Sequence, residues 1–396
     1  MIYHEFQDLK LSALGFGAMR LPTLEDGSVD AQQTEEMVRY AMGHGINYFD
    51  TAYPYHGGAS ETVLGAALKK YPRESFYLAD KYPGHQIAKS YDPAEVFEEQ
   101  LQKCQVEYFD FYLLHNVNEN SIGVYMDPQW GILDYFLEQK RLGRIRHLGF
   151  STHGEVENIR EFLDWCGDKM EFCQIQLNYL DWKLQNAKGK CELLKERNIP
   201  IWVMEPVRGG ALAALEPEAE ASLRALRPDE RAPAWALRWL QTVPQPTMVL
   251  SGMSSMAQMV ENIATYESEK PLNEAEVAAL ENIAESMLAA VPCTACRYCC
   301  DGCPKGLNIP MLLNLYNNVR IAKSVIMAAR IEGLPEDQRP SACIGCGACE
   351  AICPQKIEIP KLLAELHDTW KAMPNWAEMC RQREEAAEKK RAAKGK

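Results

Sequence analysis

Short runs of β-branched and aromatic residues alternate along the chain with segments whose apolar residues recur every three or four positions. The first pattern is typical of buried strands and the second of amphipathic helices. The predicted strands are Leu14–Met19, Asn47–Ala52, Phe76–Lys81, Asp110–His115, Ile145–Thr152, Phe172–Asn178, Pro200–Glu205 and Thr247–Gly252. The predicted helices are Gln32–Met42, a segment that begins at Ser60, Ala94–Lys103, Gln129–Leu142, Glu155–Trp165, Ala187–Arg197, Ala232–Gln241 and Met256–Thr265.

Eight strand–helix units over about 250 residues match the count and length of a closed (β/α)₈ TIM barrel, which is the fold that we predict. A doubly wound open sheet is the alternative. Such sheets often carry three glycines in the phosphate-binding turn after the first strand. The corresponding segment here, Gly15-Phe-Gly17-Ala-Met-Arg20, lacks the third glycine, which lowers this alternative.

A second region begins after a helix predicted at Asn273–Leu288, and Pro292 marks the boundary. Two runs of cysteines in this region are separated by a helical pattern over Ile309–Ile331, and a further amphipathic helix begins at Ile359. We therefore predict a barrel domain over residues 1–288, a small and mainly helical ferredoxin-like domain over 289–380, and a basic tail over 381–396.

Composition narrows the class of protein. The 396 residues, of which 47% are hydrophobic, can bury a large core and an appended domain. A net charge of −13 argues against a nucleic-acid surface, although residues 381–396 carry seven Lys or Arg against three Glu, which we interpret as a solvated helix end. No apolar run approaches the roughly 20 residues that span a bilayer. An acid near the start argues against a signal peptide, so we expect a cytoplasmic protein.

Polar residues follow three successive predicted strands. Asp50 ends the second strand and Tyr55 follows it, Lys81 ends the third, and His115 ends the fourth. Each of them alone is more often a cap or a structural partner. Because the carboxyl ends of barrel strands share one face, we expect the four side chains to lie together as a candidate catalytic site.

These residues carry a resemblance to a known family. Phe49-Asp50-Thr-Ala-Tyr-Pro-Tyr55, Lys81 and Asp110-Phe-Tyr-Leu-Leu-His115 are similar to motifs of the aldo-keto reductases, whose members reduce carbonyls with NADPH or NADH on a (β/α)₈ barrel. The resemblance covers roughly Leu11 to Ala264. It implies that this chain is an oxidoreductase that reduces an aldehyde or ketone.

Hydride chemistry assigns a role to each of the four residues. An alkoxide formed from a carbonyl needs a proton, and a tyrosine with an ordinary pKa of about 10 holds one at neutral pH, so Tyr55 is the expected proton donor. The Lys81 ammonium favours the phenolate that remains. Asp50 is expected to keep Lys81 charged and oriented. His115, expected to be neutral, would donate a hydrogen bond to the carbonyl oxygen.

The resemblance also implies cofactor contacts. Ser151 and Gln174 stand where the family contacts the nicotinamide carboxamide, and residues 205–210 resemble its pyrophosphate loop. Met204 replaces an aromatic that often stacks on the nicotinamide. The residues expected to bind cofactor are Gly17, Ser151, Gln174, Met204, Pro206, Arg208, Gly252, Ser254, Gln258, Glu261 and Asn262.

The choice between NADPH and NADH stays open. NADPH-selective members commonly carry Lys or Arg at the positions of Gly252 or Gln258, and neither base is present here. Because a 2′-phosphate is best held by arginine, this segment does not support a preference for NADP, although Arg208 or another basic residue could substitute.

Nine of the 14 cysteines lie between Cys293 and Cys353, and such a dense cluster favours metal over disulfides. A run of the form C-x₂-C-x₂-C-x₃-C-P occurs twice. It is the run of bacterial ferredoxins, in which three cysteines bind one [4Fe–4S] cluster and the fourth binds the other cluster. Zinc usually takes separated pairs and is a poor alternative. The predicted ligands are Cys293, Cys296, Cys299 and Cys353 for one cluster, and Cys343, Cys346, Cys349 and Cys303 for the other.

Two functions remain in view. The first is carbonyl reduction by a nicotinamide cofactor on the barrel, with clusters that are structural or exchange electrons with a partner protein. The second is an electron-transfer protein whose barrel mainly binds cofactor and whose clusters exchange electrons with a partner or a flavin.

The sequence also offers candidate walls of a substrate pocket, although aromatic residues on barrel loops are equally typical of ordinary packing. They are Tyr53, Tyr82, Trp130, His153 and Tyr179.

Overall fold

The computed structural model describes residues 1–288, 291, 293 and 295–394. The chain divides into two compact units, Met1–Val277 and Ala278–Lys396. The division falls inside helix α12 (Glu274–Leu288), whose last residue is the one at which we place the end of the barrel domain. The three predicted domain boundaries stay predictions.

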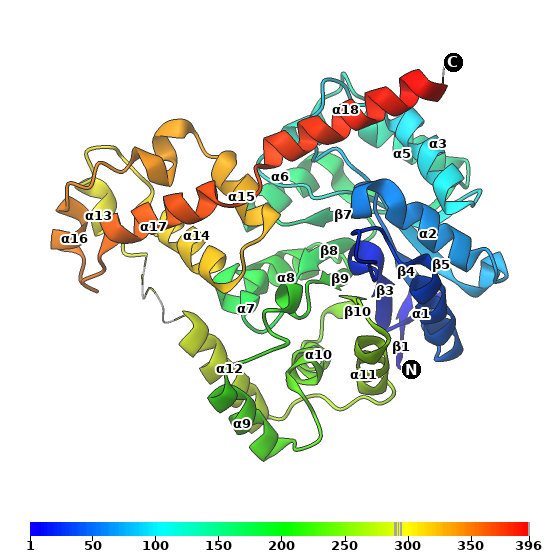
Figure 1. The fold of residues 1–396 in the computed structure, drawn as a ribbon, viewed down its shortest axis with the longest axis horizontal. Helices are drawn as coiled ribbons and strands as arrows, with labels where there is room; N and C mark the ends of the chain where they lie inside the picture. The colour runs from blue at the N-terminus through cyan, green and yellow to red at the C-terminus, as the bar shows by residue number, and fades with distance from the viewer. Residues whose placement is uncertain (289–290, 292, 294, 395–396) are drawn as a thin grey trace. The chain divides into compact units, whose positions relative to one another are not determined.

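Eight parallel strands close into a barrel in the first unit, which confirms the predicted fold (Figure 1). Every predicted strand is present, and no end differs from its prediction by more than two residues. In chain order the strands are β3 (Leu14–Gly17), β4 (Tyr48–Asp50), β5 (Tyr77–Tyr82), β6 (Phe109–Leu114), β7 (Ile145–Thr152), β8 (Cys173–Gln176), β9 (Ile201–Met204) and β10 (Pro246–Gly252). The ring closes where β10 pairs with β3.

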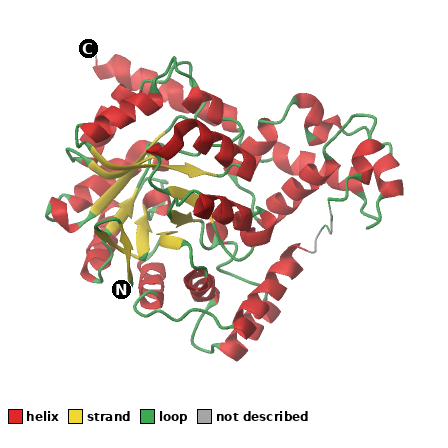
Figure 2. Cartoon of the chain, turned by 180° about the vertical axis from the view of Figure 1, so that it is seen from behind, coloured by secondary structure: helices red, strands yellow, loops and turns green. Residues whose placement is uncertain are grey.

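Helices surround the strands of this unit, and Figure 2 shows the yellow strands enclosed by red helices. They are α1 (Ala31–Gly43), α2 (Ala59–Leu68), α3 (Pro93–Cys104), α4 (Ile122–Met126), α5 (Ile132–Arg141), α6 (Val156–Cys166), α7 (Asp181–Leu184), α8 (Ala187–Glu196), α9 (Pro217–Leu226), α10 (Ala232–Thr242) and α11 (Met256–Thr265). The sequence pattern did not predict α4, α7 or α9, and the first two are too short to establish a helical period.

An N-terminal hairpin covers the start of the barrel. Its strands, β1 (Tyr3–Phe6) and β2 (Leu9–Ser12), pair antiparallel and were not predicted. The Phe6 ring lies 5.0 Å from the Trp202 ring and 5.1 Å from the His147 ring, both near the N-terminal ends of their strands. Aromatic rings therefore fill this end of the barrel interior, whereas the candidate residues at the carboxyl ends of the strands lie at the opposite end.

The second unit contains helices. The segment Ile309–Ile331, predicted to be helical, is helical with one break that the pattern did not indicate, between α14 (Ile309–Ile321) and α15 (Val325–Glu332). Ala322 has an extended backbone, and the Ser324 hydroxyl accepts a hydrogen bond from the Met327 amide. A serine cap of this kind starts a new helix, and apolar periodicity alone does not reveal it.

Leucines from two helices form the core of the second unit. Leu312 and Leu313 of α14 pack with Leu363 and Leu366 of α17 (Ile359–Lys371), and all four are buried. The last helix, α18, spans Trp376–Lys394, and the Glu332 carboxylate accepts hydrogen bonds from its first amides. Within the part of the chain that the structure describes, no helix is both long and apolar enough to cross a membrane.

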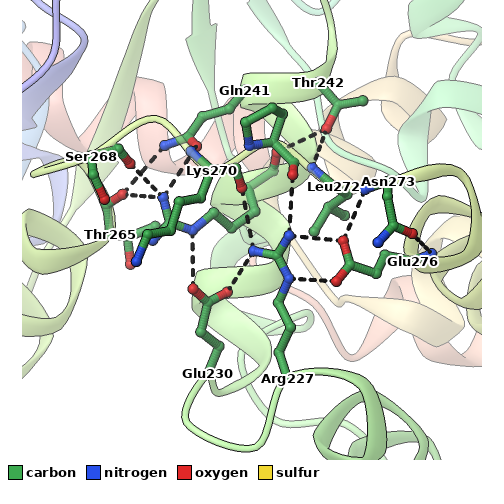
Figure 3. Close-up of polar contacts among 12 residues, drawn as sticks. Arg227, Glu230, Gln241, Thr242, Thr265, Ser268, Lys270, Leu272, Asn273 and Glu276 are labelled. Carbon is green, nitrogen blue, oxygen red and sulfur yellow. Dashed lines mark hydrogen bonds and ion pairs between the residues drawn. The ribbon is translucent and has the colours of Figure 1, made fainter.

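A polar network fastens the segment before α12 to the barrel unit (Figure 3). Arg227 donates from Nε to Glu276 Oε1 at 2.7 Å and from Nη2 to Glu276 Oε2 at 2.8 Å. Its guanidinium also donates to the carbonyls of Lys270 and Pro271. The hydrogen bond from Arg227 is the main cause that holds the pKa of Glu276 below its ordinary value.

We predict that Arg227→Met lowers the free energy of unfolding of the barrel unit at pH 7 by about 2 kcal/mol, because charge-assisted hydrogen bonds are lost. A carboxyl whose pKa is depressed by folding contributes stability above its unfolded pKa and loses it as the pH falls through the folded value. The difference between wild type and variant should therefore shrink as the pH falls below about 4.5. Chemical denaturation followed by circular dichroism measures both quantities.

Arg224→Met is the matched control, because Arg224 is exposed and its ion pair with Glu220 spans 3.6 Å on the surface of α9. It should change the free energy of unfolding by less than about 0.5 kcal/mol. Equal effects of the two substitutions, or an Arg227→Met effect that is independent of pH, would contradict this interpretation of the network.

Candidate active site and cysteine sites

The four candidate catalytic residues come from the ends of strands, or from the segments that directly follow them, on one face of the barrel. They are Asp50, Tyr55, Lys81 and His115, which we call the candidate tetrad. Side chains alternate between inside and outside along a strand. Asp50 pairs in register with Ala79, and Lys81 lies two residues further along β5, so both side chains face the barrel interior. His115 follows β6 in the same way, two residues after the buried Leu113.

Lys81 and Asp50 form a buried ion pair. Lys81 Nζ lies 2.5 Å from Asp50 Oδ1 and 2.6 Å from the carbonyl oxygen of Thr51. Burial raises the pKa of Asp50, although Lys81 opposes this effect. Burial alone would lower the pKa of Lys81, but the attraction of Asp50 and Tyr55 outweighs it and the pKa is raised. Lys81 is therefore an ammonium at neutral pH.

Tyr55 begins the short helix η2 (Tyr55–Gly58), and its ring centroid lies 4.9 Å from Lys81 Nζ. The loop is held where His56 Nε2 accepts a hydrogen bond from the Leu21 amide at 3.1 Å. Burial raises the pKa of Tyr55, and Lys81 lowers it by a smaller amount. The phenol is thus protonated at neutral pH, with an ammonium beside it that stabilises the phenolate.

His115 stands edge-on to Tyr55, with ring centroids 5.8 Å apart. Burial, and then the neighbouring His85, lower its pKa well below the ordinary value, so the ring is neutral at pH 7. The ring of His85 lies 4.4 Å from that of His115. Sequence reasoning missed His85, although its position four residues after the strand-end Lys81 was an available signal.

Ser151 and Gln174, the predicted carboxamide contacts, are register partners on β7 and β8. Ser151 Oγ accepts a hydrogen bond from the Asn116 amide at 2.8 Å. Gln174 is buried, and its Oε1 has no hydrogen-bond partner among the described residues. A buried amide oxygen without a partner is costly, so this position suits a ligand that donates a hydrogen bond, as a carboxamide does.

The loop after β9 contains the next predicted contacts. Met204 ends the strand half-buried, and Pro206 is buried. Arg208 is also buried, and its Nε lies 3.0 Å from Asp181 Oδ1. The sequence left Arg208 open as a substitute for the basic residue that binds a 2′-phosphate. Its Nε group is already engaged by Asp181. Asn178 Nδ2 donates to the Glu205 carbonyl at 3.0 Å and fixes the start of the loop.

The predicted contacts at β10 lie around the start of α11. Gly252 and Ser254 are exposed, and the Ser254 amide donates to Gln258 Oε1 at 2.8 Å. Asn262 is buried against Ser251, whereas Glu261 is exposed and paired with Arg231 at 3.0 Å. Gly17 is the register partner of Gly252 on the neighbouring strand β3. A Cβ at this position would come within 3.2 Å of the Ser251 carbonyl oxygen.

Two candidate pocket walls lie elsewhere. Tyr53 donates its hydroxyl to Glu99 of α3 at 2.9 Å. Tyr82 is buried with its ring 5.2 Å from that of Phe136 on α5, in the layer between strands and helices. Tyr82 follows Lys81 and so faces the opposite side of the strand, which makes it ordinary packing, the alternative that the sequence left open. Tyr53 is directed toward α3 by its hydrogen bond to Glu99.

The cysteine runs of the second unit meet in two enclosed sites. Each site is lined by three cysteines of one run and the last cysteine of the other run. The cysteines do not converge on one point: among the described residues, no three His, Cys, Asp or Glu side chains gather as ligands of a single metal ion. The first site is lined by Cys293, Cys296, Cys299 and Cys353, and the second by Cys303, Cys343, Cys346 and Cys349.

The two sites have matching backbones. Gly345 and Gly347 have positive φ angles in the second run, and Ala295 and Arg297 do so at the same positions of the first. Left-handed residues turn a loop sharply, which lets successive thiols face one site. Each run is also followed by a helix that starts with an Ile-Pro pair, at residues 309–310 and 359–360, and both pairs contribute to the walls of the two sites. The donor set of four thiols and the apolar walls fit a [4Fe–4S] cluster.

Comparisons with known proteins agree with this geometry. Residues 13–285 match the family described as "Aldo/keto reductase family", and residues 292–358 match the one described as "4Fe-4S dicluster domain". A solved aldo-keto reductase from Bacillus halodurans in its holo form is similar to the chain, with a TM-score of 0.58 and 27% identity over 72% of this chain and 96% of that one. A Klebsiella pneumoniae structure titled as an aldo-keto reductase in complex with NADPH has a TM-score of 0.57 at 20% identity, which shows the fold alone.

Two curated relatives are more informative about chemistry. The "NADH-specific methylglyoxal reductase" of Escherichia coli (strain K12) is 28% identical over 224 residues, which are 52% of this chain and 66% of the relative. The "L-galactose dehydrogenase" of Arabidopsis thaliana is 32% identical over 149 residues, 36% of this chain and 45% of the relative. The chain thus spans less than two thirds of the length of either relative.

The pairing of cysteines between the runs can be tested by iron content after anaerobic purification. We predict that Cys353→Ala removes about half of the iron, because only the first site loses a ligand. Adding Cys296→Ala should remove no more, since Cys296 lines the same site. Adding Cys346→Ala instead should remove nearly all of the iron.

Cys300→Ala is the control, because Cys300 lies within the first run, directly after Cys299, but lines neither site. Its iron content should equal that of the wild type. If Cys353→Ala with Cys346→Ala lost no more iron than Cys353→Ala alone, the two runs would each bind their own metal and the exchanged pairing would be wrong.

Proposed function

Because the chain belongs to the aldo/keto reductase family, we propose that its barrel reduces an aldehyde or ketone with NADPH or NADH, with Tyr55 as the proton donor. The observation that carries the proposal is the buried Lys81–Asp50 ion pair beneath the Tyr55 ring. The alignment with a methylglyoxal reductase supports a small carbonyl compound as substrate.

The residues of the barrel would handle the proton. When bound, the reduced nicotinamide supplies a hydride to the carbonyl carbon, and the carbonyl oxygen then takes the proton of the Tyr55 hydroxyl. Lys81 stabilises the phenolate that remains, and Asp50 keeps Lys81 protonated. The neutral His115 ring donates a hydrogen bond to the carbonyl oxygen, which orients the substrate and stabilises the charge that develops.

The cofactor would lie across the strand ends from β7 to β10. The unpartnered Gln174 Oε1 supports a carboxamide contact there, together with Ser151. Met204 would face the nicotinamide, Pro206 and Arg208 would frame the diphosphate, and Gly17 would lie beside it at the end of β3. The end of β10 and helix α11, which carry Gly252, Ser254, Gln258, Glu261 and Asn262, would receive the adenosine.

The second unit would hold two [4Fe–4S] clusters, and one observation favours an electron-transfer function for it. Tyr298, Ile344 and Ile352 are 56%, 59% and 52% exposed, and each lies within or beside a cysteine run. Exposed apolar residues next to a cluster suit transient contact with a redox partner protein. A hydride carries two electrons and a cluster passes one, so exchange with the barrel would need a converter such as a flavin.

We predict that Tyr55→Phe lowers kcat/KM for carbonyl reduction by about 10²–10⁴-fold, because the proton donor is lost. Nucleotide affinity, measured by fluorescence titration, should stay within about twofold, since the phenol is not expected to contact the nucleotide. The control is Tyr40→Phe on α1, where the ring stacks on His44 away from the strand ends. Full activity of Tyr55→Phe on every carbonyl that the wild type reduces would refute the mechanism.

Analysis of the protein purified without oxygen distinguishes carbonyl reduction from electron transfer as the main function. We expect iron and sulfide but no bound flavin, and cluster absorption that stays unchanged when NADH or NADPH is added. Bound flavin, or bleaching of the clusters by either nucleotide, would instead favour electron transfer as the main function.

A further inference from the structure

Arg20 lies at the end of the barrel that carries the tetrad, and no motif of the sequence assigned it a role. It ends the short helix η1 (Ala18–Arg20), directly after β3, and its side chain is exposed. A Cβ built on Gly252 would stand 3.3 Å from Cβ and Cγ of Arg20 and 3.4 Å from its Cδ. The aliphatic stem of Arg20 therefore lies over the glycine that ends β10.

The guanidinium of Arg20 reaches the loop after β9. A Cβ built on Gly209 would stand 3.0 Å from Arg20 Nη2 and 3.4 Å from Glu205 Oε2. The Gly209 amide donates a hydrogen bond to the Glu205 carboxylate. A cation and a backbone donor thus already gather around one carboxylate, which is the arrangement that binds an anion.

The backbone of this loop supports the same interpretation. Glu205 and Arg208 have positive φ angles of 58° and 48°, which side chains other than glycine rarely adopt, and Gly209 follows at 63°. Backbone strain of this kind persists where the surroundings require it, often at ligand sites. Burial raises the pKa of Glu205, and the attraction of Arg20 opposes that effect.

We propose that Arg20 contacts the diphosphate of the bound dinucleotide and supplies positive charge to it from the end of the first barrel strand, β3. This inference rests on the proposed function of the barrel. Only the stem of Arg20 lies at Gly252, whereas its tip lies at Gly209. The group contacted is therefore the diphosphate shared by NADH and NADPH. A diphosphate oxygen would accept hydrogen bonds from the Arg20 guanidinium and the Gly209 amide, in place of the Glu205 carboxylate.

Arg20→Met tests the proposal, because methionine keeps much of the stem over Gly252 and removes the charge. The dissociation constants of ADP, NADH and NADPH are measured by titration calorimetry on the full-length protein with its clusters intact. We expect all three to rise by about tenfold, the loss of a charge-assisted hydrogen bond. Arg20→Lys, which keeps the charge, should recover most of the affinity.

Arg141→Met is the matched control, since Arg141 is exposed on α5 and paired with Glu138. It should leave all three dissociation constants unchanged. If the wild type bound none of the nucleotides, the proposed function and this inference would fail together. If the wild type bound them and Arg20→Met bound ADP equally well, only the inference would fail. A loss confined to NADPH would assign Arg20 to the 2′-phosphate and overturn the diphosphate contact.

Discussion

The buried ion pair between Lys81 and Asp50 is the interaction on which the candidate active site depends. Their side chains are 1% and 4% exposed, and a charge removed from water is costly unless it is paired. Neither residue can turn elsewhere without leaving the other uncompensated. The pair exists because the register of β4 and β5 places both side chains inside the barrel. It holds an ammonium under Tyr55, so the chemistry of the phenol follows from the packing of two strands.

Much of the fold could be predicted because it depends on short-range patterns. The eight strands are short apolar runs at regular spacing, and the tetrad follows from their parity and from the shared face of the strand ends. The ligand grouping of the cysteines rests on the spacing within two runs, and the two sites of the structure have the same membership. Each of these features depends on the spacing of residues that lie close together in the sequence.

The features that sequence reasoning missed depend on contacts between distant segments. The hairpin of β1 and β2 is defined by where Phe6 packs, and its strands carry exposed or partly exposed polar residues in place of an apolar run. The break between α14 and α15 depends on one serine hydroxyl. His85 lies in the loop after β5, and Arg20 ends the short helix η1. The sequence does not indicate that His85 lies beside His115, or that Arg20 lies near Gly209 and Gly252. Loops often carry functional residues, but they lack the regular spacing of apolar residues that predicts helices and strands.

The chain joins a barrel built for two-electron chemistry to a domain suited to one-electron transfer, so the central claim concerns the source of the reducing electrons. The most direct measurement uses NADH or NADPH carrying deuterium at the transferable position, and mass spectrometry of the alcohol formed from a carbonyl that the wild type reduces. Our account predicts one deuterium bound to carbon in each product molecule, because the hydride passes directly from nicotinamide to substrate. A product without deuterium, formed at the same rate, would show that the electrons arrive by another route and would contradict the account.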